Sequence, residues 1–401
     1  MLAACCPPGG QNQNHVQKDA ALAWENSNIL WVGADAGLPP DYSEFEQLAE
    51  AEGRLVIPGL VDCHTHLAFG GWRADEFSQR ILGRNYAEIA ASGGGILKTM
   101  AATRAVSTKD LLARCRSWLA AMSYLGVTTV EAKSGYGLTA EEELRLLEIY
   151  ETLRKTQPVR IVSTLLAAHA VPPEYQSDRA AYIALLTERL IPEAAERSLA
   201  RFCDAFADES ALSLEEAESV LRAGQDRGLT PKLHADQLTD SGGAALAVSL
   251  DAASADHLDC VSEEGIEKLA NSRTVAVSLP LASLYLGTRA MPARRLIEAG
   301  VPVAVATDFN PGTAPSFHLP LAMLLACTLQ RMTPSEVLKG ATIYAAQAIR
   351  EERSVGSLEP GKQADFAIID APDVDHWLYH FAANRCVATY IAGERIYGSG
   401  W

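Results

Sequence analysis

Eight short apolar runs, rich in β-branched residues, recur along the chain, and most are separated by longer amphipathic segments of Ala, Leu and Glu. Near-continuous apolar strands joined by helical crossovers are typical of a parallel sheet buried on both faces. Eight repeats of this unit predict an α/β fold, a closed (β/α)8 barrel of the TIM type over residues 57–355. The runs cover residues 55–66, 126–136, 159–169, 200–208, 230–236, 252–258, 274–280 and 302–308.

The segments on either side of the barrel also read as strands. Residues 20–36 alternate in polarity, and residues 354–372 and 386–398 combine apolar stretches with Gly and Pro turns. We therefore expect a second, small β domain formed by residues 1–56 and 356–401 together. The first dozen residues have no periodicity, and we expect no fixed structure for them.

Composition indicates which classes of binding partner the chain is expected to have. The net charge is −16 and no Lys/Arg cluster occurs, which argues against a nucleic-acid partner and favours a small-molecule substrate. Apart from the adjacent Cys5 and Cys6, the eight cysteines are scattered and form no CxxC pair, as expected for reduced thiols in the cytoplasm. No apolar run reaches the roughly 20 residues of a membrane helix. Symmetric dimers are the commonest oligomers, so a homodimer is expected.

Five of the nine histidines lie at the carboxyl ends of predicted barrel strands, where the active sites of such barrels are built. They are His64, His66, His169, His234 and His257, and Asp308 ends the eighth run. His64 and His66 are two residues apart, so their side chains point to the same face of one strand.

Two imidazoles facing one cavity are costly to bury without partners, and a divalent metal satisfies both through neutral ring nitrogens. A lone HxH pair is a weak signal, because core histidines bonded to backbone are common. Together with His234 and Asp308 in barrel order, however, the pair predicts one metal ion. Three histidines and one aspartate suit zinc or iron better than magnesium or calcium.

Such a metal lowers the pKa of bound water toward ~7 and polarises a carbonyl group. Asp308 could take the proton of the attacking water and pass it to a leaving nitrogen. His257 could orient or polarise the attacked group, or it could be a histidine that supports the ligands from behind. The predicted reaction is hydrolysis of an amide-like C–N bond.

The chain resembles the imidazolonepropionase family of the amidohydrolase superfamily. The resemblance rests on IPGLVDCHTHLAFGGWRADEF, VEAKSGYGL, LLAAHAVPPEY, KLHADQL, SADHL and ATDFNPGTAPS, and it runs from about residue 55 to 350. It implies that water opens the ring of 4-imidazolone-5-propanoate to give N-formimidoyl-L-glutamate in histidine degradation. It also implies the metal ligands His64, His66, His234 and Asp308.

The resemblance further implies substrate contacts, and the chemistry of the residues agrees with several of them. The fork of donors on Arg73 suits the propanoate carboxylate, although a surface arginine is the ordinary alternative. Tyr136 lies between two glycines, on a loop that can approach a ligand closely. The remaining implied contacts are His169, Gln237, Asn310, Gly312 and Thr313.

Gln237 departs from the family pattern, in which a glutamate often stands three residues after the metal ligand His234. Glutamine cannot act as a base. Either Gln237 only binds substrate while Asp308 is the base, or His257 shares that task; we favour Asp308. Two alternatives stay open: another single-metal amidohydrolase acting on a cyclic amide or amidine, and a barrel that has lost catalysis. No lysine ends the third or fourth run, which argues against a carbamylated lysine between two metals.

Overall fold

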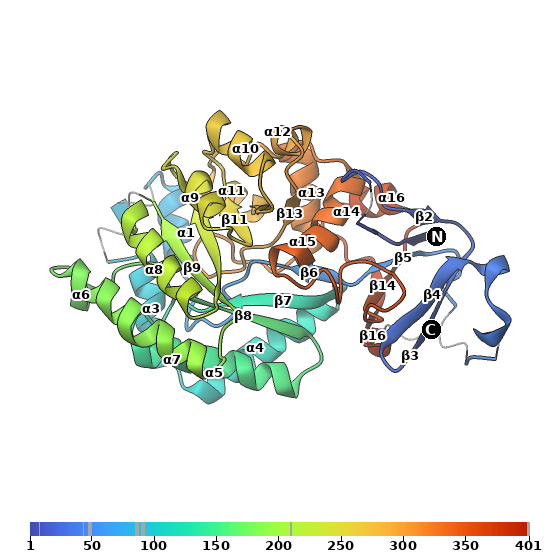
Figure 1. Ribbon diagram of the computed structural model, residues 1–401, viewed down its shortest axis with the longest axis horizontal. Coiled ribbons are helices and arrows are strands. Elements are labelled where there is room, and N and C mark those ends of the chain that lie inside the picture. The colour runs from blue at the N-terminus through green and yellow to red at the C-terminus, as the bar shows by residue number, and fades with distance from the viewer. Residues whose placement is uncertain are drawn as a thin grey trace.

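The predicted runs form an eight-stranded parallel sheet that curls into a barrel, and Figure 1 shows the helices around it. The computed structural model describes residues 1–7, 9–42, 44–46, 50–84, 88–89, 93–208 and 211–398. Neighbouring barrel strands pair in chain order, as expected when each crossover returns to the next position. The strands are β6 (Leu60–Asp62), β7 (Val127–Lys133), β8 (Arg160–Ala168), β9 (Phe202–Ala207), β10 (Thr230–Ala235), β11 (Ser254–His257), β12 (Val275–Ser278) and β13 (Val303–Val305).

The ring closes where β6 and β13 run past their regular ends. Thr65 and Phe309 form a parallel bridge. The amide of Asp308 donates to the His64 carbonyl at 3.0 Å, and the amide of His66 donates to the Phe309 carbonyl at 2.9 Å. These bonds interleave the two strand ends, so closure itself brings Asp308 beside the two histidines.

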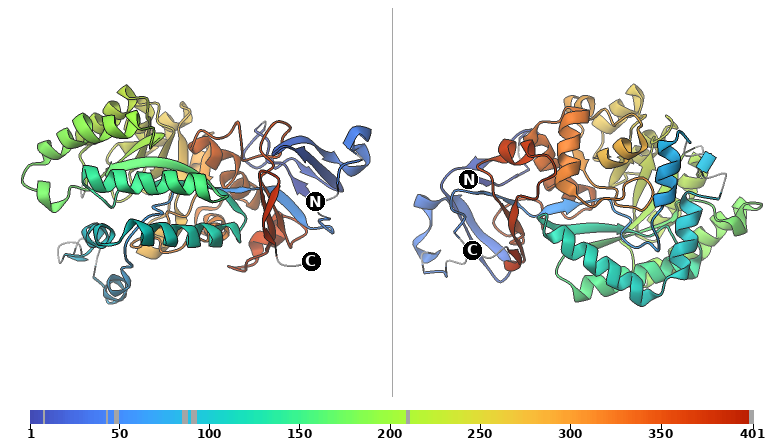
Figure 2. Two further views of the ribbon diagram at one scale, coloured as in Figure 1. Left: turned by 90° about the horizontal axis from the view of Figure 1, so that it is seen from below. Right: turned by 180° about the vertical axis from the view of Figure 1, so that it is seen from behind.

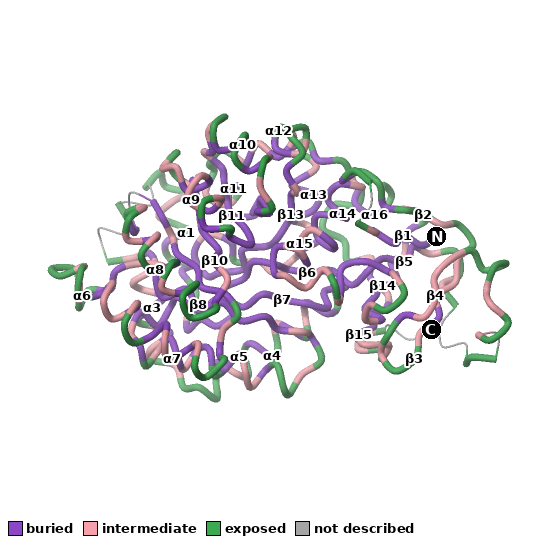
Figure 3. The backbone as a smooth tube through the Cα atoms, in the orientation of Figure 1, coloured by how far each residue is buried: buried purple, intermediate pink, exposed green. Residues whose placement is uncertain are grey.

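Helices cover the outside of the barrel, and the strands beneath them are buried along almost their whole length (Figure 3). Local signals fix several helix starts: Ser213 and Glu216 form a capping box at α8, and Thr333 and Glu336 form one at α14. In the part of the chain that the structure describes, no helix has both the length and the apolar character needed to cross a membrane. The α-helices are α1 (Ala74–Ile81), α3 (Ile96–Ala105), α4 (Thr108–Ser123), α5 (Ala140–Thr156), α6 (Arg179–Ala184), α7 (Ile191–Glu196), α8 (Leu214–Asp226), α9 (Gly243–Ser249), α10 (Glu263–Ala270), α11 (Pro280–Leu286), α12 (Ala293–Glu298), α13 (Leu319–Gln330), α14 (Pro334–Gly340), α15 (Ile343–Ala348) and α16 (Val374–Tyr379), with short helices η1 (Asp35–Gly37), η2 (Pro40–Tyr42), η3 (Pro173–Tyr175) and the π-helical η4 (Leu185–Leu190).

A second sheet, built from both ends of the chain, packs against the barrel, as predicted, and both termini lie on its side of the molecule (Figure 2). The predicted run over residues 55–66 contributes to both sheets, because it divides at Gly59. A Cβ atom there would lie 2.2 Å from Thr128 Oγ1. The six-stranded sheet has the order β16 (Glu394–Gly398), β15 (Cys386–Ile391), β14 (Phe366–Ile369), β5 (Leu55–Pro58), β1 (Leu2–Ala3) and β2 (Val16–Gln17), and β3 (Ala20–Glu25) and β4 (Asn28–Ala34) form a separate hairpin.

The expectation that the first dozen residues lack fixed structure is wrong for most of them. β1 pairs with β5, and the buried side chain of Gln11 binds the barrel strand β13. Gln11 Nε2 donates to the Val303 carbonyl at 2.7 Å, and its Oε1 accepts from the Val303 amide at 3.1 Å. The amide side chain thus acts as a strand partner, a role that periodicity cannot reveal.

We expect Gln11→Ala to lower the free energy of unfolding by about 1–3 kcal/mol, because it leaves a buried N–H and C=O of β13 unpaired. Urea unfolding of the full chain measures this loss. Gln13→Ala, on an exposed neighbour in the same segment, is the matched control. Equal unfolding midpoints for the two variants would contradict a stabilising role for the hydrogen bonds between Gln11 and β13.

Candidate active site

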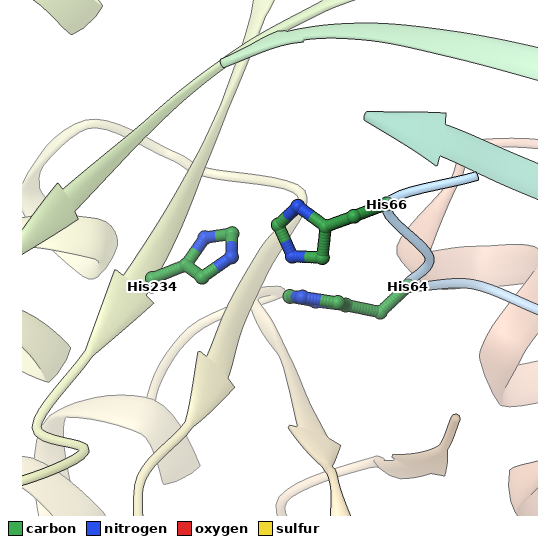
Figure 4. Close-up of side chains that lie close together, drawn as sticks. All are labelled: His64, His66 and His234. Carbon is green, nitrogen blue, oxygen red and sulfur yellow. The ribbon is translucent and has the colours of Figure 1, made fainter. Parts of the chain in front are cut away.

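The four predicted metal ligands come together at the carboxyl ends of the barrel strands. His64, His66, His234 and Asp308 are each at most 3% exposed. Asp308 Oδ1 lies 3.4 Å from His64 Nε2 and 3.4 Å from His66 Nε2. The three histidines each offer a ring nitrogen within 4.8 Å of the others, and their rings point toward one another in Figure 4.

The donor atoms of this cluster fit a divalent cation. His64 Nε2 and His234 Nε2 are buried and have no hydrogen-bond partner among the described residues. Their other ring nitrogens face carboxylates: His64 Nδ1 lies 2.6 Å from Asp256 Oδ2, and His234 Nδ1 lies 3.2 Å from Asp204 Oδ1. A carboxylate that binds Nδ1–H leaves the Nε2 lone pair free for a metal. The family's single-metal site is therefore compatible with this geometry.

The electrostatics of His66, His234 and Asp308 match the protonation states of metal ligands, whereas the raised pKa of His64 favours its protonated form. Burial lowers the pKa of His66, and it lowers the pKa of His234 well below the ordinary value. Burial alone would raise the pKa of Asp308, but hydrogen bonding with His64 and His66 brings it well below its usual range. Burial and the Lys133 charge act to lower the pKa of His64, yet Asp256 outweighs them and raises it.

His257, predicted to orient or polarise the attacked group, faces the same centre from the end of β11. It offers one ring nitrogen within 4.8 Å of ligand atoms of His64 and Asp308, and burial lowers its pKa to about 4. Its backbone φ is +78°, and that of Asp308 is +55°. Aspartate and histidine adopt left-handed backbone more readily than most residues, so both angles fit the residue types at these positions.

Tyr136 and His169 form one wall beside the metal ligands. The His169 ring stacks on His66 with centroids 5.0 Å apart, and the Tyr136 ring lies 5.6 Å from His66. Glu143 holds the Tyr136 loop, because its buried carboxylate accepts from the amides of Gly135, Gly137 and Leu138. The sequence analysis did not identify Glu143.

Arg73 forms an open cationic site beside the loop that follows Asp308. Its side chain is almost fully buried, yet among the described residues Nε and Nη1 have no hydrogen-bond partner. The nearest carboxylate oxygen, Glu76 Oε2, is 3.8 Å away from Nη1. A Cβ atom on Gly312 would lie 1.0 Å from Arg73 Nη2, so only glycine leaves room for this guanidinium. The buried position removes the alternative of a surface arginine.

Asn310, Gly312 and Thr313 lie together on that loop, but the side chain of Asn310 is used up within it. Its Nδ2 donates to the Asp308 carbonyl and to Thr313 Oγ1, and its Oδ1 accepts from the amides of Gly312 and Thr313. The amide group therefore holds the shape of the loop around Asp308. A direct substrate contact by Asn310 stays a prediction.

Gln237 forms no hydrogen bond with the cluster through its side chain among the described residues. It is half-buried on the loop after β10, where its carbonyl contacts Cys260 Sγ at 3.5 Å.

A group of buried charges beneath the histidines was missed in the sequence. These side chains have no exposed surface and contact one another inside the barrel. Spacing offered a signal for two of them, because Glu131 lies two residues before Lys133 and Lys232 lies two residues before His234, so each shares a strand face with that residue. The five residues are Glu131, Lys133, Asp204, Lys232 and Asp256.

Known proteins resemble this chain in sequence and in fold. The family model described as "Amidohydrolase family" matches residues 55–396. Imidazolonepropionase of Treponema denticola is 44% identical over 94% of this chain and 91% of its own length, and that of Geobacillus kaustophilus is 45% identical over 94% and 89%.

Solved structures of lower identity share the fold. A triazine hydrolase variant has a TM-score of 0.78 at 17% identity and covers 99% of this chain and 93% of its own. An adenosine deaminase from Xanthomonas campestris with bound zinc has a TM-score of 0.71 at 18% identity, covering 99% and 91%. On the family model and the extended sequence identity, the chain belongs to the amidohydrolase family and, within it, to the imidazolonepropionases.

Proposed function

We propose that this chain hydrolyses 4-imidazolone-5-propanoate to N-formimidoyl-L-glutamate, using one divalent metal ion held by His64, His66, His234 and Asp308. The chain matches relatives over 91% and 89% of their length, and these relatives are named imidazolonepropionases. The observation that carries the substrate assignment is the buried guanidinium of Arg73 next to the Asp308 loop, of which two nitrogens form no hydrogen bond within the described part of the chain.

Arg73 binds the propanoate carboxylate. A guanidinium presents parallel N–H donors that match the two oxygens of a carboxylate, and burial strengthens such a pair. Tyr136 and His169 pack against the substrate from the wall beside His66. Gly312, Thr313 and Asn310 shape the side of the pocket where the tail lies, and Gln237 reaches the substrate from the rim.

The bound metal supplies Lewis acidity and lowers the pKa of water. The oxygen of water adds to the ring carbonyl carbon, and Asp308 accepts the proton that this oxygen loses. The bond from that carbon to the ring nitrogen then breaks, and Asp308 returns the proton to the nitrogen. The new carboxyl group releases the second proton of the water to solvent and becomes a carboxylate. His257 hydrogen-bonds the carbonyl oxygen and stabilises the charge that develops on it.

We propose zinc or iron as the metal, since nitrogen-rich sites with one carboxylate suit both. We further propose that the enzyme works in the cytoplasm, as expected for a small-molecule catabolic enzyme with scattered free cysteines. A symmetric homodimer is the expected assembly.

The experiment is to supply imidazolone propanoate to the purified chain and follow the decay of its ultraviolet absorbance, with and without a chelator. We expect rapid decay that the chelator abolishes and that added zinc or iron restores. If the metal-loaded protein left imidazolone propanoate unchanged but hydrolysed another cyclic amide, that amide would replace imidazolone propanoate as the proposed substrate. No hydrolysis of any cyclic amide would favour an inactive barrel.

A further inference from the structure

Behind the proposed metal ligands lies a layer of buried charged side chains from barrel strands β7, β9, β10 and β11. Glu131 and Lys133 lie on β7, Asp204 on β9, Lys232 on β10 and Asp256 on β11, and each is 0% exposed. Burying five charges is costly unless each is paired closely. The two lysines of this layer differ in their ion-pair partners, and this difference points to separate roles for them.

The ammonium group of Lys133 joins two carboxylates that each hold a metal-ligand histidine. Lys133 Nζ donates to Asp204 Oδ2 at 2.7 Å and lies 3.4 Å from Asp256 Oδ2. Asp204 contacts His234 Nδ1 at 3.2 Å, and Asp256 contacts His64 Nδ1 at 2.6 Å. One side chain from the second barrel strand is thereby linked to imidazoles of the first and fifth strands.

Lys232 is matched to Lys133 in type and burial, and both lysines lie near Glu131 and Asp256, but only Lys133 contacts Asp204 among the described residues. Lys232 Nζ lies 3.1 Å from Glu131 Oε2 and 3.4 Å from the carbonyl oxygens of Cys63 and Ala348. Its distance to Asp256 is 4.0 Å, and among the described residues no ion pair joins it to Asp204. Lys232 therefore supports the barrel floor, and only Lys133 holds both carboxylates behind the histidines.

We propose that Lys133 is a positioning residue of the metal centre, which fixes Asp204 and Asp256 and, through them, the orientation of His234 and His64. This inference rests on the metal site proposed above. Asp204, His234 and Asp256 each place a ligand atom within 4.8 Å of the others, so without the ammonium the two carboxylates face each other with no cation between them. We expect the two carboxylates to turn apart, so that the imidazoles of His64 and His234 no longer direct their free ring nitrogens at one metal position.

The test compares Lys133→Met with Lys232→Met, two substitutions that each remove one buried ammonium and keep much of the side-chain volume. The metal-loaded proteins are mixed with a chelator and the rate of metal loss is followed. Loss of a group that orients metal ligands weakens metal binding about 10- to 100-fold. We expect Lys133→Met to lose its metal faster by about this factor, and Lys232→Met to lose it at a rate close to that of the wild type.

Loading the site with cobalt gives a second measurement, which does not change when a substitution only lowers the stability of the fold. In the cobalt-loaded proteins, the visible absorption reports ligand geometry. We expect the spectrum of Lys133→Met to change and that of Lys232→Met to match the wild type, even where both lower the melting temperature. Unchanged spectra and metal-loss rates in Lys133→Met would overturn the proposal. A wild-type chain that binds no metal would instead refute the proposed function.

A second variant covers the case that Lys133→Met does not fold. The layer holds two lysines and three carboxylates, a net charge of −1 that Lys133→Met changes to −2. Lys133→Met/Glu131→Gln restores −1 by neutralising the carboxylate that, among the described residues, forms no hydrogen bond with a histidine ring. We expect this double variant to fold and still lose metal faster than Glu131→Gln alone. Equal rates for these two would show that charge balance suffices, and would overturn the proposal.

Discussion

Asp308→Asn is expected to lower kcat by about 10³-fold or more, because an amide cannot carry a proton from water to the leaving nitrogen. Asparagine keeps the shape of the side chain and tolerates the left-handed backbone of this position, where φ is +55°. The backbone of the loop is therefore retained, and the loss reports chemistry. Initial rates of imidazolone propanoate hydrolysis, expressed per bound metal, give the effect, because Asp308 also contributes to the metal site.

Gln237→Ala is the comparison that tests this assignment. Gln237 is half-buried at the rim and makes no side-chain hydrogen bond to the histidines among the described residues, so we expect a loss of at most about tenfold. Losses of similar size in the two variants would contradict the assignment of Asp308 as the principal proton carrier.

Arg73→Met should lower kcat/KM by about 10²- to 10³-fold, chiefly through KM, because hydrogen bonds to a charged group contribute about 1.5–3 kcal/mol each. Arg73→Lys keeps the charge but not the fork of donors, and we expect an intermediate loss. Steady-state kinetics on the full substrate measure both variants.

The control for Arg73 is a substrate without the tail. On an imidazolone that lacks the propanoate group, wild type and Arg73→Met should have nearly equal kcat/KM values. If Arg73→Met were equally impaired on both substrates, the guanidinium would act on the ring or on the fold, and the assignment of the tail would fail.

The barrel and the meeting of the four candidate metal ligands could be predicted from the sequence because both depend on local patterns. The apolar runs locate the strands, and the histidines fall where runs end, so His64, His66, His234 and Asp308 converge once the ring closes. Arg73 was identified through family resemblance, and the structure adds that it is buried with donors free. Its surroundings depend on Gly312, which is far away in the sequence.

The buried charges and the amino-terminal tether could not be predicted in the same way. Lys133 and Lys232 look like polar interruptions in apolar strands, and what they stabilise depends on carboxylates from β7, β9 and β11. Gln11 lies in a segment without periodicity, yet its side chain completes the edge of β13. Both depend on contacts between distant parts of the chain, on which neither propensity nor periodicity carries information.

The most direct test of the account is the position of the metal in a crystal of the loaded protein, located by anomalous scattering at the absorption edges of zinc and iron. The account predicts one peak per chain, about 2.0–2.2 Å from nitrogens of His64, His66 and His234 and from a carboxylate oxygen of Asp308. No peak at either edge in metal-loaded crystals, or a peak held only by the deeper carboxylates Asp204 and Asp256, would contradict it.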